Sequence, residues 1–283
     1  SSGSEVVAQL PLPNVEAKGQ DSEAQREYEV IRDAFRRLIH HWENSAERED
    51  IIEDIITHRC SFLIDRALRG LALDFDEALS ILRNHNNFTT ERERQQHEIL
   101  VAAIDNLIDF AAAEEMTMIS ELPEEVDEKC LLDYDTICEQ YNLTYAEAEN
   151  EQVLFAAKMA AWWMAVNAES VITYMTQGDE RVRPWHLSLE GVSYRKSEFP
   201  AELIPPIEWG CRCYLIANGF AGVRASLSID KCRSMVDPVF RESLATGGRI
   251  FTDAHRYFDK PRPEFVQKIV KRLKSKFYEQ DND

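Results

Sequence analysis

The fold is decided by residues 144–175, which read TYAEAENEQVLFAAKMAAWWMAVNAESVITYM. The apolar side chains of this stretch recur at helical spacing: Leu154, Phe155, Met159, Trp162, Trp163, Val166 and Ile172. Thr144, followed three residues later by Glu147, fits the capping pattern of a helix start. We therefore predict a central helix from Thr144 to about Met175, with its two tryptophans in the core, that leads directly into the segment beyond it.

Glycine and proline divide the chain around this stretch. No glycine occurs between Gly70 and Gly178, and Pro123 is the only proline between Pro13 and Pro184. Both residue types disfavour helix interiors, so the long segment before Gly178 is predicted to be helical.

Three further helices are predicted within this segment from apolar periodicity and capping residues. One begins at Ser22, one spans roughly 46–71 and one spans about 90–119. Beyond residue 178, short apolar pieces at 191–194 and 213–216 alternate with turn residues, which is typical of short strands. The fold class is therefore α+β, with an N-terminal multi-helix region followed by a small loop-rich domain with short antiparallel strands.

The predicted organisation has four parts. Residues 1–22 are a cloning scar and flexible leader, because they begin Ser-Ser-Gly-Ser and show no apolar period. Residues 23–175 are the helical region, residues 176–258 a motif domain, and residues 259–283 a basic C-terminal helix. No run approaches 18 apolar residues, so no transmembrane helix is expected. Six cysteines without a secretory signal favour a reduced, intracellular protein.

The charge of the chain is negative and unevenly distributed. The net charge is −19, from 51 acidic and 32 basic side chains. This argues against a general nucleic-acid-binding protein, because phosphate contacts require lysine and arginine. A local basic cluster nevertheless lies near the C-terminus: Lys268, Lys271, Arg272, Lys274 and Lys276. It is either a solvated helix face or a docking surface for DNA or an acidic partner.

Four charged residues and a proline follow Gly178 closely. Asp179, Glu180, Arg181 and Arg183 place four charges in five positions, and such residues can form bidentate arginine–carboxylate pairs that hold a loop without regular structure. Pro184 restricts the backbone immediately before His186. The residues of the whole motif are Asp179, Arg181, Arg183, Pro184, His186, Gly191, Pro205, Pro206, Trp209, Cys211, Arg212 and Cys213.

His186, Cys211 and Cys213 are candidate metal ligands. Their nitrogen and sulfur atoms suit zinc, and a Cys-x-Cys pair in an extended segment places both thiols on one side. The candidates for a fourth ligand are Cys232, His255 and Asp179. Two other interpretations stay open: the cysteines pack as small apolar residues while His186 joins the ion pairs, or they form a redox-labile pair.

Four blocks of this region resemble, in order, the phage Mu F-like minor head proteins. They are T-x-G-D-x-R-V-R-P-x-H at 176–186, L-x-G at 189–191, P-P-x-x-W-G-C-R-C at 205–213, and a downstream stretch from Asp237-Pro238 through Gly247–Phe251 to His255–Phe258. The resemblance covers residues 176–258. Residues 23–175 resemble the helical part of such proteins only by position and composition.

The resemblance implies a structural, non-enzymatic head-morphogenesis protein of a tailed phage or prophage. Such a protein would act in procapsid assembly near the portal, in the bacterial host cytoplasm and then in the virion head. Its partners would be the portal and other head proteins, with the portal or packaged DNA as the candidate contact of the basic helix, and no membrane. An alternative is a toxin-like or hydrolytic enzyme that uses His186, Asp179, Glu180 and Arg183.

Overall fold

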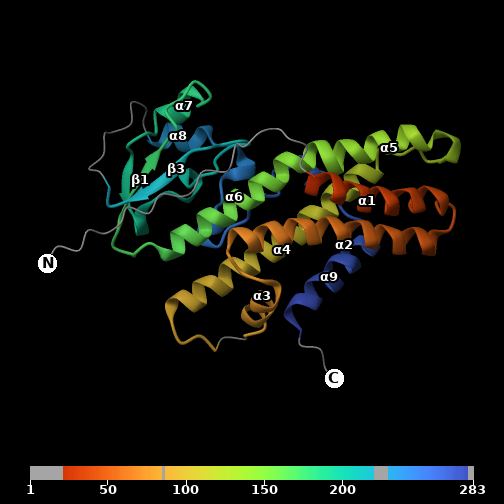
Figure 1. The fold of residues 1–283 in the computed structure, drawn as a ribbon, viewed down its shortest axis with the longest axis horizontal. Helices are drawn as coiled ribbons and strands as arrows, with labels where there is room; N and C mark the ends of the chain where they lie inside the picture. The colour runs from red at the N-terminus through yellow and green to blue at the C-terminus, as the bar shows by residue number, and fades with distance from the viewer. Residues whose placement is uncertain (1–21, 85–86, 220–228, 280–283) are drawn as a thin grey trace.

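The computed structural model describes residues 22–84, 87–219 and 229–279, and predictions for residues 1–21 lie outside this range. The α-helices are α1 Ser22–His40, α2 Ser45–Gly70, α3 Phe75–Leu82, α4 Glu91–Ile119, α5 Leu131–Glu139, α6 Ala146–Ala165, α7 Pro184–Leu187, α8 Ile229–Met235 and α9 Glu264–Tyr278. The strands are β1 Val171–Met175, β2 Ser193–Arg195 and β3 Tyr214–Ala217. The predicted α+β class is confirmed (Figure 1).

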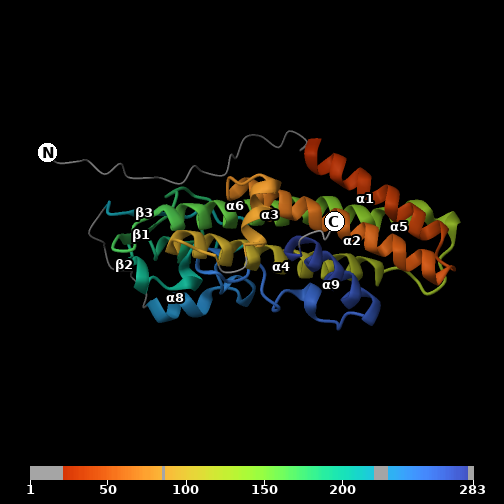
Figure 2. The ribbon, with the colours of Figure 1, turned by 90° about the horizontal axis from the view of Figure 1, so that it is seen from below.

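The helices form an elongated bundle with the small sheet at one end (Figures 1 and 2). Helix α2 lies at its centre and packs against α1, α4 and α6. Helix α6 runs from the bundle to the sheet, and α9 returns to pack across α4. Within the described ranges, no helix is long and apolar enough to cross a lipid bilayer.

Side-chain caps mark the starts of two helices, and the start of α4 agrees with the predicted one. Asp74 and Glu77 form a complete capping box at the start of α3. Thr90 accepts the Glu93 backbone N–H at the start of α4. The predicted spans 46–71 and 90–119 agree with the observed α2 and α4 to within a residue at each end.

The prediction of one helix from Thr144 to Met175 is wrong at both ends. Thr144 lies inside a π-helical segment, Gln140–Tyr145, that joins α5 to α6 without a break. Helix α6 ends at Ala165, and the Lys196 ammonium donates to the Trp163 and Val166 carbonyls at 2.6 and 2.7 Å. Residues 171–174 are β-branched or aromatic and form a strand instead. The tryptophan pair is buried as predicted.

Strand β1 is the centre of an antiparallel sheet with the order β2-β1-β3. Ile172 lies opposite Tyr194 of β2, and Tyr174 lies opposite Leu215 of β3. Side chains alternate between the faces of a strand, so Tyr174 and Leu215 share one buried face. Cys213, immediately before β3, is also buried.

The downstream blocks fold back onto the helical bundle. Gly247 adopts a left-handed conformation with φ 79°, as the turn requires. Ile250 and Phe251 form no strand, and their backbone N–H groups instead donate to Asn106 of α4. The Asn106 side chain accepts both backbone N–H groups at 2.9 Å and donates to the Phe251 carbonyl at 2.7 Å.

A charged network lies in the middle of the bundle. Arg59 of α2 is 1% exposed and donates to Glu114 of α4 at 2.5 Å and to Glu149 of α6 at 2.9 Å. The Tyr257 hydroxyl from the last block donates to Glu149 at 2.9 Å. Burial raises the pKa of Glu149, and the adjacent Glu114 raises it further. The network therefore connects three helices and the chain after the sheet at one buried point.

Candidate functional site

The two central motif blocks meet at the end of the sheet. The first block leaves β1, and Gly178 allows its turn with φ 65°. Helix α7 then begins at Pro184, where the missing N–H costs nothing. Gly191 closes the segment, since its N–H donates to the Tyr174 carbonyl at 2.8 Å. The second block follows residue 204 and ends in β3.

His186 lies at the centre of the two blocks and is 1% exposed. Its Nε2 atom lies 2.9 Å from a Glu208 carboxylate oxygen. Its Nδ1 atom faces the two thiols, 3.5 Å from Cys213 Sγ and 4.0 Å from Cys211 Sγ. The predicted grouping of these three residues is therefore confirmed, and Glu208 joins them as a fourth.

Arg183 connects the same carboxylate to the second block. Its Nε atom lies 3.0 Å from Glu208, and its terminal nitrogen donates to the Trp209 carbonyl at 2.7 Å. Glu208 thus accepts from Arg183 on one oxygen and contacts His186 with the other. Charge-assisted hydrogen bonds of this kind are stronger than neutral ones, so they hold the first block against the second.

A second ion pair joins the blocks nearer the surface. Arg212 donates to both oxygens of Asp179, at 2.9 and 2.6 Å. The hydrogen bonds from Arg212 lower the pKa of Asp179. The Arg212 carbonyl in turn accepts from Gln177 at 3.0 Å. Asp179 and Arg183 were expected to pair within their own block, but each takes its partner from the other block.

The other charged residues of the first block face solvent. Arg181 and Glu180 are exposed, and the Arg181 backbone N–H donates to Asp179 at 3.1 Å. Arg181 also lines a small cleft with Arg183 and Arg212 that reaches His186 and Cys213. The enzymatic alternative groups His186, Asp179, Glu180 and Arg183. Of these, only His186 and Arg183 share a partner, Glu208.

The two thiols are buried and differ in acidity. Burial raises the pKa of Cys211, but hydrogen bonds from Cys213 and His186 outweigh it and leave that pKa well below its ordinary value. The Cys211 contact and burial raise the pKa of Cys213. Tyr174 of β1 is buried, and burial together with the neighbouring Cys211 and Cys213 raises its pKa. All six cysteines of the chain are free.

The prolines and the tryptophan of the second block contact the chain that follows. Trp209 packs edge-on against Phe240, with ring centroids 5.0 Å apart, and stacks on Phe251 at 5.6 Å. Pro205 and Pro206, joined by a cis peptide bond, line a small cleft beside α6.

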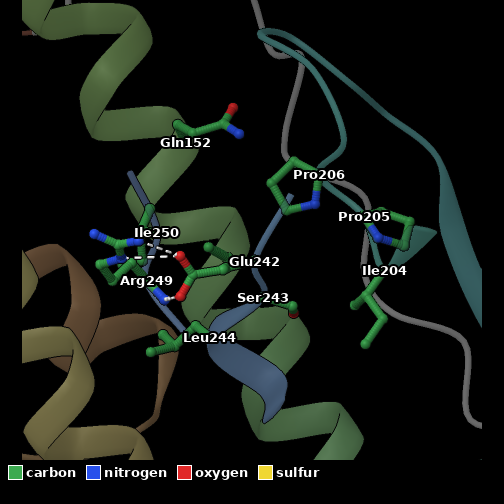
Figure 3. A pocket seen from close by; sticks show the side chains of 10 residues that line it. Gln152, Ile204, Pro205, Pro206, Glu242, Ser243, Leu244, Arg249 and Ile250 are labelled. Atoms are coloured by element: carbon green, nitrogen blue, oxygen red, sulfur yellow. Dashed lines mark hydrogen bonds and ion pairs between the residues drawn. The ribbon is translucent and has the colours of Figure 1, made fainter. Parts of the chain in front are cut away.

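Figure 3 shows this cleft from close by. Arg249 and Glu242 form an ion pair at 2.5 Å beside it, Gln152 of α6 lies near this pair, and Pro205 and Pro206 lie across from them. The cleft therefore lies where α6, the second block and the downstream segment 242–250 meet.

The basic residues of α9 divide into two groups. Three of them form ion pairs within the protein: Arg272 with Glu53, Lys274 with Asp109, and Lys268 with Glu264. Lys271 and Lys276 are exposed. Part of the cluster thus fastens α9 to α2 and α4, and the remainder faces solvent.

Sequence reasoning missed Glu208 and Tyr174. Glu208 occupies one of the two x positions of the P-P-x-x-W-G-C-R-C pattern, so the pattern did not single it out. An acidic residue there complements the arginines of the first block. Tyr174 was assigned to a helix, which hid its place opposite β3. The alternation of Ile172 and Tyr174 was the available signal for the strand.

Comparison with known proteins supports the resemblance of the motif blocks. Residues 114–216, about a third of the chain, match the family described as Phage Mu protein F like protein. The match begins in α4 and ends in β3, so it includes both central blocks and excludes the downstream ones. The resemblance to the Mu F-like family is thereby confirmed over these residues, and it indicates a phage head-morphogenesis protein.

One curated relative matches over a short segment. An uncharacterized protein of Methanocaldococcus jannaschii is 50% identical over 42 residues, which are 15% of this chain and 7% of that protein. No solved structure matches.

Proposed function

We propose that this chain is a structural minor head protein of a tailed phage or prophage that acts in procapsid assembly near the portal. The observation that carries the proposal is the family match over residues 114–216. These residues form one continuous unit, from the end of α4 through α5, α6 and the sheet. Its site of action would be the assembling head in the host cytoplasm and later the virion head.

The geometry of the motif supports a structural role. Asp179 and Arg183 are both used to join the two blocks, through Arg212 and Glu208. Beyond the sheet, Tyr257 and Phe251 attach the following chain to the bundle. The motif residues therefore hold the sheet, the loops and the helices in one arrangement, as an assembly component needs for a defined binding surface.

The solvent-facing part of α9 is the proposed contact with the portal or with packaged DNA. Lys271 and Lys276 are exposed on a helix whose Arg272 and Lys274 form ion pairs with α2 and α4. Ion pairs fix the helix to the bundle, so the two lysines are presented on a rigid element. A rigid basic face suits an acidic partner surface or phosphate groups.

Co-purification with the portal tests this proposal. The chain would be co-expressed with the affinity-tagged portal protein encoded beside it, and recovery would be compared between wild type and Lys271→Glu/Lys276→Glu. Lys129→Glu/Arg195→Glu changes two exposed cations elsewhere and gives the same change in net charge.

We expect the wild type and the control variant to co-purify with the portal and the α9 variant to be depleted at least about tenfold, equivalent to about 1.4 kcal/mol. Equal recovery of both variants would remove α9 as the contact. No recovery of the wild type would contradict the portal association itself.

A further inference from the structure

The three donor atoms around His186 are already spaced as zinc ligands. Zinc bonds of about 2.3 Å to sulfur and about 2.0 Å to nitrogen, at tetrahedral angles, place nitrogen and sulfur about 3.5 Å apart. The observed Nδ1–Sγ distances are 3.5 Å to Cys213 and 4.0 Å to Cys211. The three ligand atoms all lie within 4.8 Å of one another, and all three residues are buried.

Glu208 prepares the histidine for metal binding. Its carboxylate lies 2.9 Å from Nε2 of His186. Since a carboxylate accepts hydrogen bonds, Nε2 is the protonated ring nitrogen and donates a hydrogen bond to Glu208. The Nδ1 lone pair is then directed at the two thiols. Arg183 holds the other Glu208 oxygen at 3.0 Å and so fixes the carboxylate. A carboxylate that orients a histidine in this way is the usual surrounding of a zinc-bound imidazole.

The Tyr174 hydroxyl is a separate observation that points to the same place. Tyr174 is 1% exposed, and its hydroxyl makes no hydrogen bond to an oxygen or nitrogen atom in the part of the chain that the structure describes. A buried hydroxyl without a partner costs about 1–3 kcal/mol. The neighbours of this hydroxyl are Cys211 and Cys213. Thiolates bound to a metal would accept its hydrogen bond and remove that cost.

Charge and access are also satisfied. Two thiolates neutralise a divalent zinc ion, so the buried site carries no net charge. The cleft lined by Arg181, Arg183 and Arg212 reaches His186 and Cys213. The donor group is therefore close to the surface at this cleft. Nitrogen and sulfur donors select zinc over magnesium or calcium.

We propose that His186 Nδ1, Cys211 Sγ and Cys213 Sγ bind a zinc ion that fastens the two motif blocks together, with Glu208 orienting the histidine and Tyr174 donating to a thiolate. The ion would stabilise the junction of α7, the second block and β3. This inference is independent of the proposed head function, because a metal-free chain could still bind the portal.

Metal content of the full chain is the first test. The protein would be purified without added metal or chelator, and zinc and other transition metals would be measured by mass spectrometry against protein concentration. We expect about one zinc per chain and a lower melting temperature after removal with a strong chelator. Less than about 0.2 zinc per chain, unchanged after dialysis against zinc, would overturn the proposal.

Variants then test the ligands. Cys213→Ser should lose the bound zinc, while Cys232→Ser, which makes the same change at a buried cysteine outside the group, should retain it. Glu208→Gln should weaken zinc binding about 10–100-fold, and Glu190→Gln should leave it unchanged. Full zinc retention by Cys213→Ser would exclude the site.

Cobalt titration of the metal-free wild type provides a test that needs no variant to fold. Bound Co²⁺ should show intense tetrahedral d–d bands and thiolate-to-cobalt absorption in the near ultraviolet. A weak octahedral spectrum without the thiolate band would contradict the two cysteine ligands.

Discussion

Replacement of Asn106 by leucine tests how the chain after the sheet is attached to the bundle. Asn106 is 4% exposed on α4 and makes three hydrogen bonds to one short segment. It accepts from the Ile250 and Phe251 N–H groups, both at 2.9 Å, and donates to the Phe251 carbonyl at 2.7 Å. Leucine has a similar volume but cannot make any of these bonds, so three backbone groups would lose their partner.

The magnitude follows from the cost of buried, unpaired polar groups. Each such group costs about 1–3 kcal/mol, and local movement or water entry recovers part of this. We therefore expect Asn106→Leu to destabilise the protein by about 3–5 kcal/mol. Asn106→Asp would keep the two accepted bonds but set a carboxylate against the Phe251 carbonyl. Its defect should shrink as the pH falls, because a protonated carboxyl can donate to that carbonyl.

Hydrogen exchange measures the local effect at residues 250–251, and denaturant unfolding measures the effect on global stability. The Ile250 and Phe251 amides should exchange at least about 100-fold faster in Asn106→Leu, as expected for a loss of about 3 kcal/mol. The urea midpoint should fall at an unchanged slope. Gln95→Leu, at a solvent-accessible amide of the same helix, should stay within about 0.5 kcal/mol of wild type. An Asn106→Leu protein with wild-type amide protection would refute the reasoning.

Three further predictions concern buried charge. Arg59→Met should lower the free energy of unfolding, measured in urea, by about 3–5 kcal/mol, because it leaves Glu114 and Glu149 without their cation. A decrease below about 1 kcal/mol would contradict this prediction. Burial and the neighbouring Glu114 raise the pKa of Glu115, so above pH 4.5 the folded state loses stability as the pH rises, by up to about 1.4 kcal/mol per pH unit. Glu115→Gln should flatten this dependence of the urea midpoint on pH between about pH 5 and 8. An unchanged slope in the variant would count against Glu115 as its source. Burial lowers the pKa of His255 to about 4, so the folded state should lose stability as the pH falls from about 6.5 towards 4. His255→Asn should reduce that loss in thermal melts over this pH range. An equal loss in the variant would exclude His255 as its source.

The parts of the fold that follow local patterns were predictable. Helices α2 and α4 match their predicted bounds because periodicity and capping residues agree there. The stretch at 144–175 misled at both ends. A π-helical segment carries the chain through Thr144 without a new start, and the apolar residues at 171–174 fit a strand as well as a helix.

Ligand chemistry made part of the site predictable, even though its residues lie in two separate blocks. His186, Cys211 and Cys213 were grouped from ligand chemistry alone. Glu208 is 22 residues from His186, and Asp179 pairs with Arg212 across 33 residues. Asn106 and Phe251 are 145 residues apart. No local spacing indicates such pairs, because the first two form only when the motif blocks meet at the sheet, and the third only when the returning chain packs against α4.

Portal-dependent incorporation into heads tests the central claim most directly. Proheads would be assembled in cells from the capsid and scaffold proteins encoded with this chain, with and without the portal, and the copy number of the chain per purified particle would be measured by quantitative mass spectrometry. The account predicts that the chain is present in proheads that contain the portal and strongly depleted in those that lack it. Absence of the chain from portal-containing proheads, or equal copy numbers in both, would contradict a role in head assembly near the portal.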